Sequence, residues 1–158
     1  MEQTFTPISE LGRNELLNKL KQYKGYKHPT LKIDNGDDAA ILAPSNDCMS
    51  LFSSDSFVEG ADFDPTYTPL KHFGYKMIAA SISDILAMNG VPTAALINLA
   101  IPNRFSVEMI IELYEGINNA CTHYGLAIMV GDITGNHQNA VFSVSVVGEV
   151  PTKKIVKR

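Results

Sequence analysis

The stretch TPLKHFGYKMIAASISDILAMNGVPTAALINLAIP, residues 68–102, decides the fold because it joins a helix to a buried strand. Thr68 can cap the helix, whose apolar and small residues continue to Asn89 and Gly90, a typical helix end. The apolar run over residues 93–102 then predicts a buried strand. A helix followed at once by a buried strand indicates a layered domain, with helices packed on a sheet.

Further elements extend from this stretch in both directions. The spacing of isoleucine and leucine predicts a short helix from Ile8 to about Lys21, and Ser106 can cap a second long helix that ends at Gly125. Strands are expected at residues 39–42, 48–53, 126–132 and 140–150. The first two of these strands are a plausible hairpin or adjacent pair, because a turn-like segment separates them. The order predicts an α+β (α/β layered) domain with a mixed sheet covered by helices.

Composition excludes several classes of protein. A chain of 158 residues with 45% hydrophobic and 19% charged residues is expected to form one globular domain. The net charge of -4 gives no basic surface for nucleic acid, and no apolar stretch approaches the roughly 20 residues of a membrane helix. The first residues show no secretory signal, so we expect a cytoplasmic protein whose Cys48 and Cys121 are ordinary small apolar residues.

Acidic residues are unusually isolated from basic ones in this sequence. Eight of them lie between Ile33 and Leu70, a segment without a single Lys, Arg or His. Asp84 and Asp132 likewise lie in long stretches without Lys or Arg. Their charge must be balanced by distant residues, by protons or by bound cations. Because carboxylate and hydroxyl oxygens dominate the pattern, the cation would be magnesium or calcium rather than zinc.

The positions of four aspartates suggest that they converge on one crevice. Asp38 lies in a turn before an expected strand, and Asp55 and Asp132 follow expected strands. Asp84 lies on the first long helix between apolar residues, where an aspartate is expensive to bury alone. Ordinary turn or capping roles are the simpler explanation for four others, Asp34, Asp37, Asp47 and Asp64.

Four motifs in register resemble a known enzyme family. They are NGDDAAIL (35–42), SSDSFVEG (53–60), FGYKMIAASISDILAMNGVP (73–92) and VGDIT (130–134). In this order and at these separations they are similar to the N-terminal half of thiamine-monophosphate kinase. That enzyme belongs to the superfamily of aminoimidazole ribonucleotide synthetase. The resemblance covers nearly the whole chain, and the SSD and SDILAM motifs favour the kinase over its relatives.

The resemblance implies a fold and an activity. The fold would be that of the aminoimidazole ribonucleotide synthetase-like N-terminal domain, whose sheet completes a barrel in a homodimer. The activity would be transfer of the γ-phosphoryl group of ATP to thiamine monophosphate, which gives thiamine diphosphate. Residues 1–158 would form a single N-terminal domain for ATP binding, magnesium binding and dimerisation, with the family's C-terminal domain absent. We therefore expect this chain alone to lack kinase activity.

The resemblance also implies roles for individual residues. Asp62 stands where the family has a histidine that contacts thiamine phosphate, and Val130 replaces a glycine. Direct metal-assisted transfer requires no catalytic nucleophile from the protein. The implied magnesium ligands are Asp38, Ser53, Ser54, Asp55, Asp84 and Asp132. The implied ATP contacts are Gly131, Asp132 and Arg158.

Two other functions remain open at the level of sequence. The chain would also suit another ATP-using member of the superfamily, such as an enzyme of the aminoimidazole ribonucleotide synthetase type. Alternatively, it is a cation-binding dimerisation module without catalysis, for which Asp62 and Val130 are the supporting features.

Overall fold

The computed structural model describes four helices and seven strands, over residues 5–29, 31–33, 41–42, 45–129 and 131–157. The helices are α1 (Ile8–Leu11), α2 (Arg13–Leu20), α3 (Leu70–Ala87) and α4 (Val107–Tyr124). The strands are β1 (Leu31–Ile33), β2 (Ile41–Leu42), β3 (Cys48–Val58), β4 (Val91–Pro102), β5 (Ala127–Ile128), β6 (Asp132–Asn136) and β7 (Val141–Pro151).

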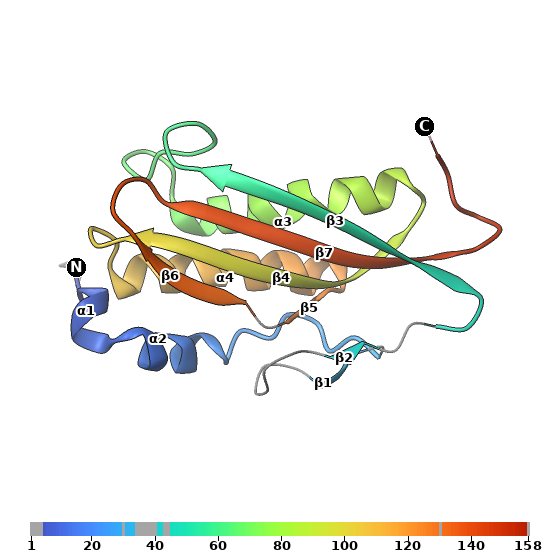
Figure 1. Cartoon of the computed structure of the whole chain (residues 1–158), viewed down its shortest axis with the longest axis horizontal. Coiled ribbons are helices and arrows are strands. Elements are labelled where there is room, and N and C mark those ends of the chain that lie inside the picture. Colours follow the sequence, from blue (N-terminus) through green and yellow to red (C-terminus); the bar gives the residue numbers. More distant parts are fainter. Residues whose placement is uncertain (1–4, 30, 34–40, 43–44, 130, 158) are drawn as a thin grey trace.

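The main sheet is mixed, as the sequence predicts. Its strand order is β3, β7, β4, with β5 and β6 both beside β4. The central strand β7 is antiparallel to both neighbours, whereas β5 and β6 run parallel to β4. Figure 1 shows α3 and α4 side by side on the same face of this sheet. The predicted layered α+β fold is therefore confirmed, and a separate pair of strands, β1 and β2, lies outside the main sheet.

The core lies between the main sheet and the two long helices. On β7, side chains alternate between the two faces, and Phe142, Val144 and Val146 are buried on the helix side. Aromatic rings fill one end of this layer, where the Phe63 ring stacks on the Phe73 ring at 4.1 Å between centroids. Burial of these apolar side chains is the main favourable contribution to folding.

The long helices end as their sequences predict. The Ser106 hydroxyl caps α4 by accepting a hydrogen bond from the Met109 N–H, and Gly125 ends that helix in the left-handed conformation at φ 76°. Helix α3 ends at a left-handed residue, Asn89, with φ 61°. The following N–H, of Gly90, donates to the Ile85 carbonyl at 2.9 Å, as in a Schellman motif.

The start of α3 differs from the prediction, because Thr68 does not cap it. The residue before the helix is Pro69, and no side chain accepts a capping hydrogen bond there. Residues 64–68 form a turn instead, in which the Thr68 N–H donates to the Asp64 carbonyl at 2.8 Å. The turn takes Thr68 away from the capping position.

The first predicted helix, Ile8 to about Lys21, is broken into α1 and α2. Gly12 separates them with φ 81° and ψ 152°, a conformation that side chains rarely adopt. The prediction of one continuous helix is therefore wrong. It relied on the spacing of apolar residues, which continues through Gly12 without showing the break.

Strand β3 is longer than predicted and has a different partner. It continues through Ser53, Ser54 and Asp55 to Val58 and pairs with β7 along its whole length. Polar residues are tolerated there because β3 is an edge strand with access to solvent. The expected hairpin between residues 39–42 and 48–53 is wrong, because β2 pairs with β1, a strand that the sequence did not reveal.

The single strand predicted at residues 126–132 is two strands. Between them the Met129 N–H donates to the Ala95 carbonyl of β4 at 2.8 Å. Asp132 therefore begins β6, whereas the sequence predicted that it lies at the end of a strand.

Two glycines allow the backbones of α3 and α4 to touch. A Cβ atom on Gly74 would lie 2.2 Å from the Leu113 carbonyl oxygen, and one on Gly116 would lie 1.9 Å from the Lys71 carbonyl oxygen. Real Cβ atoms do not approach backbone atoms so closely. The separation of the two helices therefore depends on the absence of side chains at both positions.

We expect Gly116→Ala to lower the free energy of unfolding by roughly 2 kcal/mol, because the methyl group forces the helices apart and this cost exceeds alanine's gain in helix propensity. Urea unfolding followed by circular dichroism measures the change. Gly135→Ala is the control, because a Cβ atom there meets nothing within 4 Å. Equal stabilities of the two variants would contradict the proposed close contact.

Candidate functional site

One edge of the sheet brings together a serine and an aspartate from the predicted metal-binding set. The Ser53 hydroxyl on β3 donates to Asp84 Oδ2 on α3 at 2.9 Å. Asp55 lies two residues further along β3, so its side chain projects from the same face of the strand as Ser53. Asp55 is half-buried and Asp84 is exposed. The β3 edge thus carries two carboxylates and a hydroxyl on the helix side of the sheet.

Ser54 projects from the opposite face of β3. Its hydroxyl lies 3.0 Å from the hydroxyl of Ser145 on β7, and one of the two donates to the other. Because successive residues of a strand face opposite ways, Ser54 cannot join Ser53 and Asp84 without a change in the strand. The structure does not bring this predicted ligand to the same place.

Asp132 lies near the edge of the sheet opposite β3, since β7 and β4 separate its strand, β6, from β3. Its carboxylate forms an ion pair with the Arg13 guanidinium at the start of α2. Its N–H donates to Asn98 Oδ1 at 3.0 Å, which fixes the start of β6 against β4. Within the described residues, Asp132 is not grouped with Asp55 and Asp84.

Gly131 has a packing reason to be glycine. A Cβ atom there would lie 1.7 Å from the Ile97 carbonyl oxygen of β4. Any side chain would push the backbone away from β4 just before Asp132. The requirement for glycine therefore exists without a nucleotide, and the predicted ATP contact at Gly131 stays a prediction.

The side chain of Asp62 accepts a hydrogen bond within the turn that follows β3. Its Oδ2 accepts a hydrogen bond from the Val58 N–H at 2.7 Å, and the Lys76 ammonium donates to its main-chain carbonyl at 3.3 Å. The carboxylate thus closes the turn after β3. This local role explains an aspartate at the position where the resemblance implies a histidine, and a substrate contact at Asp62 stays a prediction.

Two predicted site residues, Asp38 and Arg158, lie outside the described residues, as does Val130. In the part of the chain that is described, no three His, Cys, Asp or Glu side chains gather into a metal-binding group. The chemistry at the β3 edge nevertheless suits a hard cation, because Ser53, Asp55 and Asp84 offer only oxygen donors. Oxygen donors of this kind are typical of magnesium and calcium sites, whereas structural zinc sites are built mainly from Cys and His.

Comparison with known proteins gives the family. The family described as "AIR synthase related protein, N-terminal domain" matches residues 36–150, which is most of the chain. The chain belongs to this family. The thiamine-monophosphate kinase of Bacillus subtilis (strain 168) is 32% identical to this AIR synthase related chain over 123 residues, which are 78% of the chain and 38% of that enzyme.

Two solved structures share the fold of this AIR synthase related domain. The thiamine-monophosphate kinase from Stenotrophomonas maltophilia K279a superposes with a TM-score of 0.74 at 23% identity, over 89% of this chain and 42% of that one. A structure described as AaThiL complexed with AMPPCP and TMP gives a TM-score of 0.64 at 28% identity, over 94% and 45% of the two chains. The chain spans less than half the length of each of these relatives.

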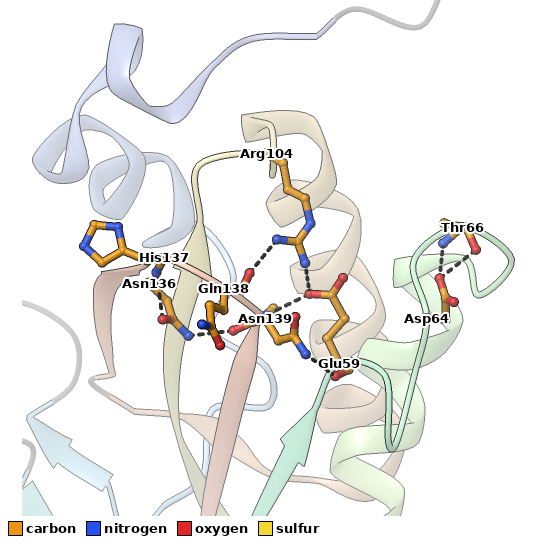
Figure 2. Close-up of polar contacts among 9 residues, drawn as sticks. Glu59, Asp64, Thr66, Arg104, Asn136, His137, Gln138 and Asn139 are labelled. Carbon is orange, nitrogen blue, oxygen red and sulfur yellow. Dashed lines mark hydrogen bonds and ion pairs between the residues drawn. The ribbon is translucent and has the colours of Figure 1, made fainter.

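A polar cluster that sequence reasoning missed joins three loops of the AIR synthase related domain. Figure 2 shows Arg104, which follows β4, between Glu59, which follows β3, and the β6–β7 connection. The guanidinium pairs with the Glu59 carboxylate and donates to the Gln138 carbonyl. The Ala140 N–H also donates to Glu59 Oε2, at 2.8 Å. The only sign of this cluster in the sequence is that Glu59 lies in an acidic segment without Lys, Arg or His, which indicates a distant partner for its charge.

The described helices include none long and apolar enough to cross a membrane.

We expect Glu59→Gln to lower the free energy of unfolding by roughly 1–2 kcal/mol, because its side chain is only 12% exposed and its charge is paired with Arg104. Glu115→Gln is the matched control, since Glu115 pairs with Lys71 at the surface with 44% exposure. That change should stay within about 0.5 kcal/mol. Urea denaturation measures both, and a Glu59 effect no larger than the Glu115 effect would disprove a structural role for the cluster.

Proposed function

We propose that this chain provides the ATP- and magnesium-binding part of a thiamine-monophosphate kinase. The observation that carries the proposal is the contact of Ser53 with Asp84 beside Asp55, three residues of the SSD and SD motifs. These motifs are far apart in sequence, and the fold places them at one edge of the sheet. Family membership and the similarity to named thiamine-monophosphate kinases support the same assignment.

Magnesium would be held at the β3 edge by Ser53, Asp55 and Asp84. The resemblance also implies Asp38, Ser54 and Asp132 as ligands, but Ser54 faces the other side of β3, and β7 and β4 separate Asp132 from β3, so these two do not join Ser53, Asp55 and Asp84 in the described fold. When bound, the cation neutralises the phosphates of two polyanionic substrates, which otherwise repel each other. The carboxylates of the chain would position that positive charge. Direct transfer between the substrates requires none of them to act as a nucleophile.

The substrates are proposed from the relatives. The structure described as AaThiL was solved with AMPPCP, an ATP analogue, and with TMP, which supports ATP as phosphoryl donor and thiamine monophosphate as acceptor. The relatives are more than twice as long as this chain, so the reaction belongs to the longer protein. For the chain by itself, the proposal is magnesium-dependent nucleotide binding without transfer.

A homodimer is part of the proposal. Both long helices lie on one face of the main sheet (Figure 1). The other face carries a second apolar cluster formed by Ala94, Ala127, Met129 and Val147. Phe52, which is 76% exposed, lies opposite Val147 in the β3–β7 pairing. An exposed phenylalanine beside an apolar cluster suits contact with a second copy of this sheet, as the predicted barrel requires.

The cytoplasm is the proposed location. Both cysteines of the chain, Cys48 and Cys121, are free thiols. Burial raises the pKa of Cys121 to about 12, which keeps that thiol protonated and unreactive. Free thiols are typical of a reducing compartment.

We expect the chain to bind AMPPCP only with magnesium, and Asp84→Asn to weaken that binding at least about tenfold, because a charged ligand to the cation is lost. Isothermal titration calorimetry measures both affinities. Asp47→Asn is the control, since Asp47 has φ 62°, which asparagine also tolerates. Binding that is independent of magnesium, or equal in the Asp84 and Asp47 variants, would refute the proposed site.

We expect light scattering to give twice the mass of the chain at micromolar concentration, and Phe52→Glu to give the mass of one chain. A buried glutamate would be charged and unpaired in the interface. Tyr67→Glu, which replaces a 77% exposed aromatic residue in a loop, should leave the mass unchanged. A single-chain mass for the unmodified protein would overturn the dimer.

A further inference from the structure

A pocket of about 540 Å³ lies between the turn before α3, the first turns of α4 and the segment before α1. Two aromatic residues line it, Phe5 from the segment before α1 and Tyr67 from the turn. Two acidic residues of α4, Glu108 and Glu112, also line it, and none of its described lining residues is basic. The volume is in the range of small-molecule sites. The pocket therefore combines aromatic rings with negative charge.

Neither carboxylate of the pocket has a basic partner among the described residues. Glu108 accepts hydrogen bonds from the Thr6 N–H at 2.9 Å and from the Thr6 hydroxyl at 2.6 Å. Burial alone would raise the pKa of Glu108, but these hydrogen bonds lower it to about 2, so the group is charged at neutral pH. Glu112 is half-buried and forms no hydrogen bond or ion pair with the described residues. The two glutamates lie one helical turn apart, where like charges repel, so a bound cation would stabilise both.

The two aromatic side chains are exposed, although the backbone beside each of them is fixed. Tyr67 is 77% exposed and Phe5 is 58% exposed. Beside Tyr67, the N–H and the hydroxyl of Thr66 both donate to Asp64 Oδ1 (Figure 2). Beside Phe5, Thr6 is held by the two hydrogen bonds to α4. Aromatic rings that are presented to solvent in this way suit quaternary ammonium ligands, because the face of a ring attracts positive charge.

We propose that this pocket binds a small organic cation, a quaternary ammonium group with an apolar body. Glu112 balances the charge of the ligand, and Tyr67 and Phe5 contact its apolar surface. The inference goes beyond the proposed function and does not depend on it. Asp84 lies fourteen residues after Leu70 of the pocket on α3, which is about 21 Å at 1.5 Å per residue.

The alternative is that the pocket is a solvent-filled hollow between the starts of α3 and α4. Glu112 would then be an ordinary surface charge, and the exposed rings would have no ligand. A hollow of this kind would show no preference for a charged compound over a neutral compound of the same shape. The binding site predicts such a preference, together with a loss of affinity when either the carboxylate or the ring is removed.

The test is a titration of the chain with benzyltrimethylammonium, followed by the amide signals in nuclear magnetic resonance spectra. The signals of Tyr67, Met109 and Glu112 should shift along a saturable curve. Glu112→Gln should weaken binding about threefold, because the charge that balances the ligand is lost. Tyr67→Leu should also weaken it about threefold, because leucine is apolar but has no ring face to attract the cation.

Glu115→Gln is the matched control, because Glu115 lies on the same helix but pairs with Lys71 and does not line the pocket. It should leave the affinity unchanged. Choline and 3,3-dimethylbutan-1-ol have nearly the same shape with and without the charge, and the unmodified chain should bind choline more tightly. The inference is wrong if the folded chain gives no saturable shift, if the neutral compound binds as tightly as choline, or if the Glu112 and Glu115 variants lose equal affinity. None of these results bears on magnesium-dependent binding of AMPPCP, so the proposed function is tested separately.

Discussion

The backbone contact between α3 and α4 governs the arrangement of this domain. Gly74 and Gly116 let the two helices approach until a carbonyl of each meets the α-carbon region of the other. Both helices then fit on one face of the same sheet (Figure 1). A helix is a rigid rod over this length, so the contact near its start also determines where its later turns lie. Asp84, ten residues after Gly74, thereby reaches Ser53 on the edge strand.

The acidic residues find several kinds of partner in the folded chain. Asp62 and Asp64 accept hydrogen bonds from nearby backbone N–H groups. Glu59 and Asp132 pair with arginines that are 45 and 119 residues away in sequence. Asp84 has a neutral partner, the Ser53 hydroxyl, and no ion pair among the described residues. Among the described residues, Asp55 and Asp84, which the motifs mark for cation binding at β3, form no ion pair with a basic side chain, and the same holds for Asp62 and Asp64.

Strand order separates residues that sequence reasoning grouped together. Asp55 and Asp132 both lie at or near apolar runs, which suggested neighbouring strand ends. In the sheet, β7 and β4 lie between them. The strand that separates them most directly, β7, comes last in the sequence, and nothing in the spacing of the aspartates indicates that it inserts there. Arg13 illustrates the same limit, because its contact with Asp132 joins the first helical segment to the edge of a sheet formed much later in the chain.

The sequence by itself determined the features that depend on neighbouring residues. These are the two long helices with the Ser106 cap and the Asn89 end, the buried strands β4 and β7, and the family motifs. Local periodicity and backbone preference are sufficient for such features. Only the tertiary structure decided the break at Gly12, the extension of β3 through Asp55, and the partners of Ser54 and Asp132. Those outcomes depend on which strands pair and how closely helices approach, because contacts between distant residues leave no periodic signal in the chain.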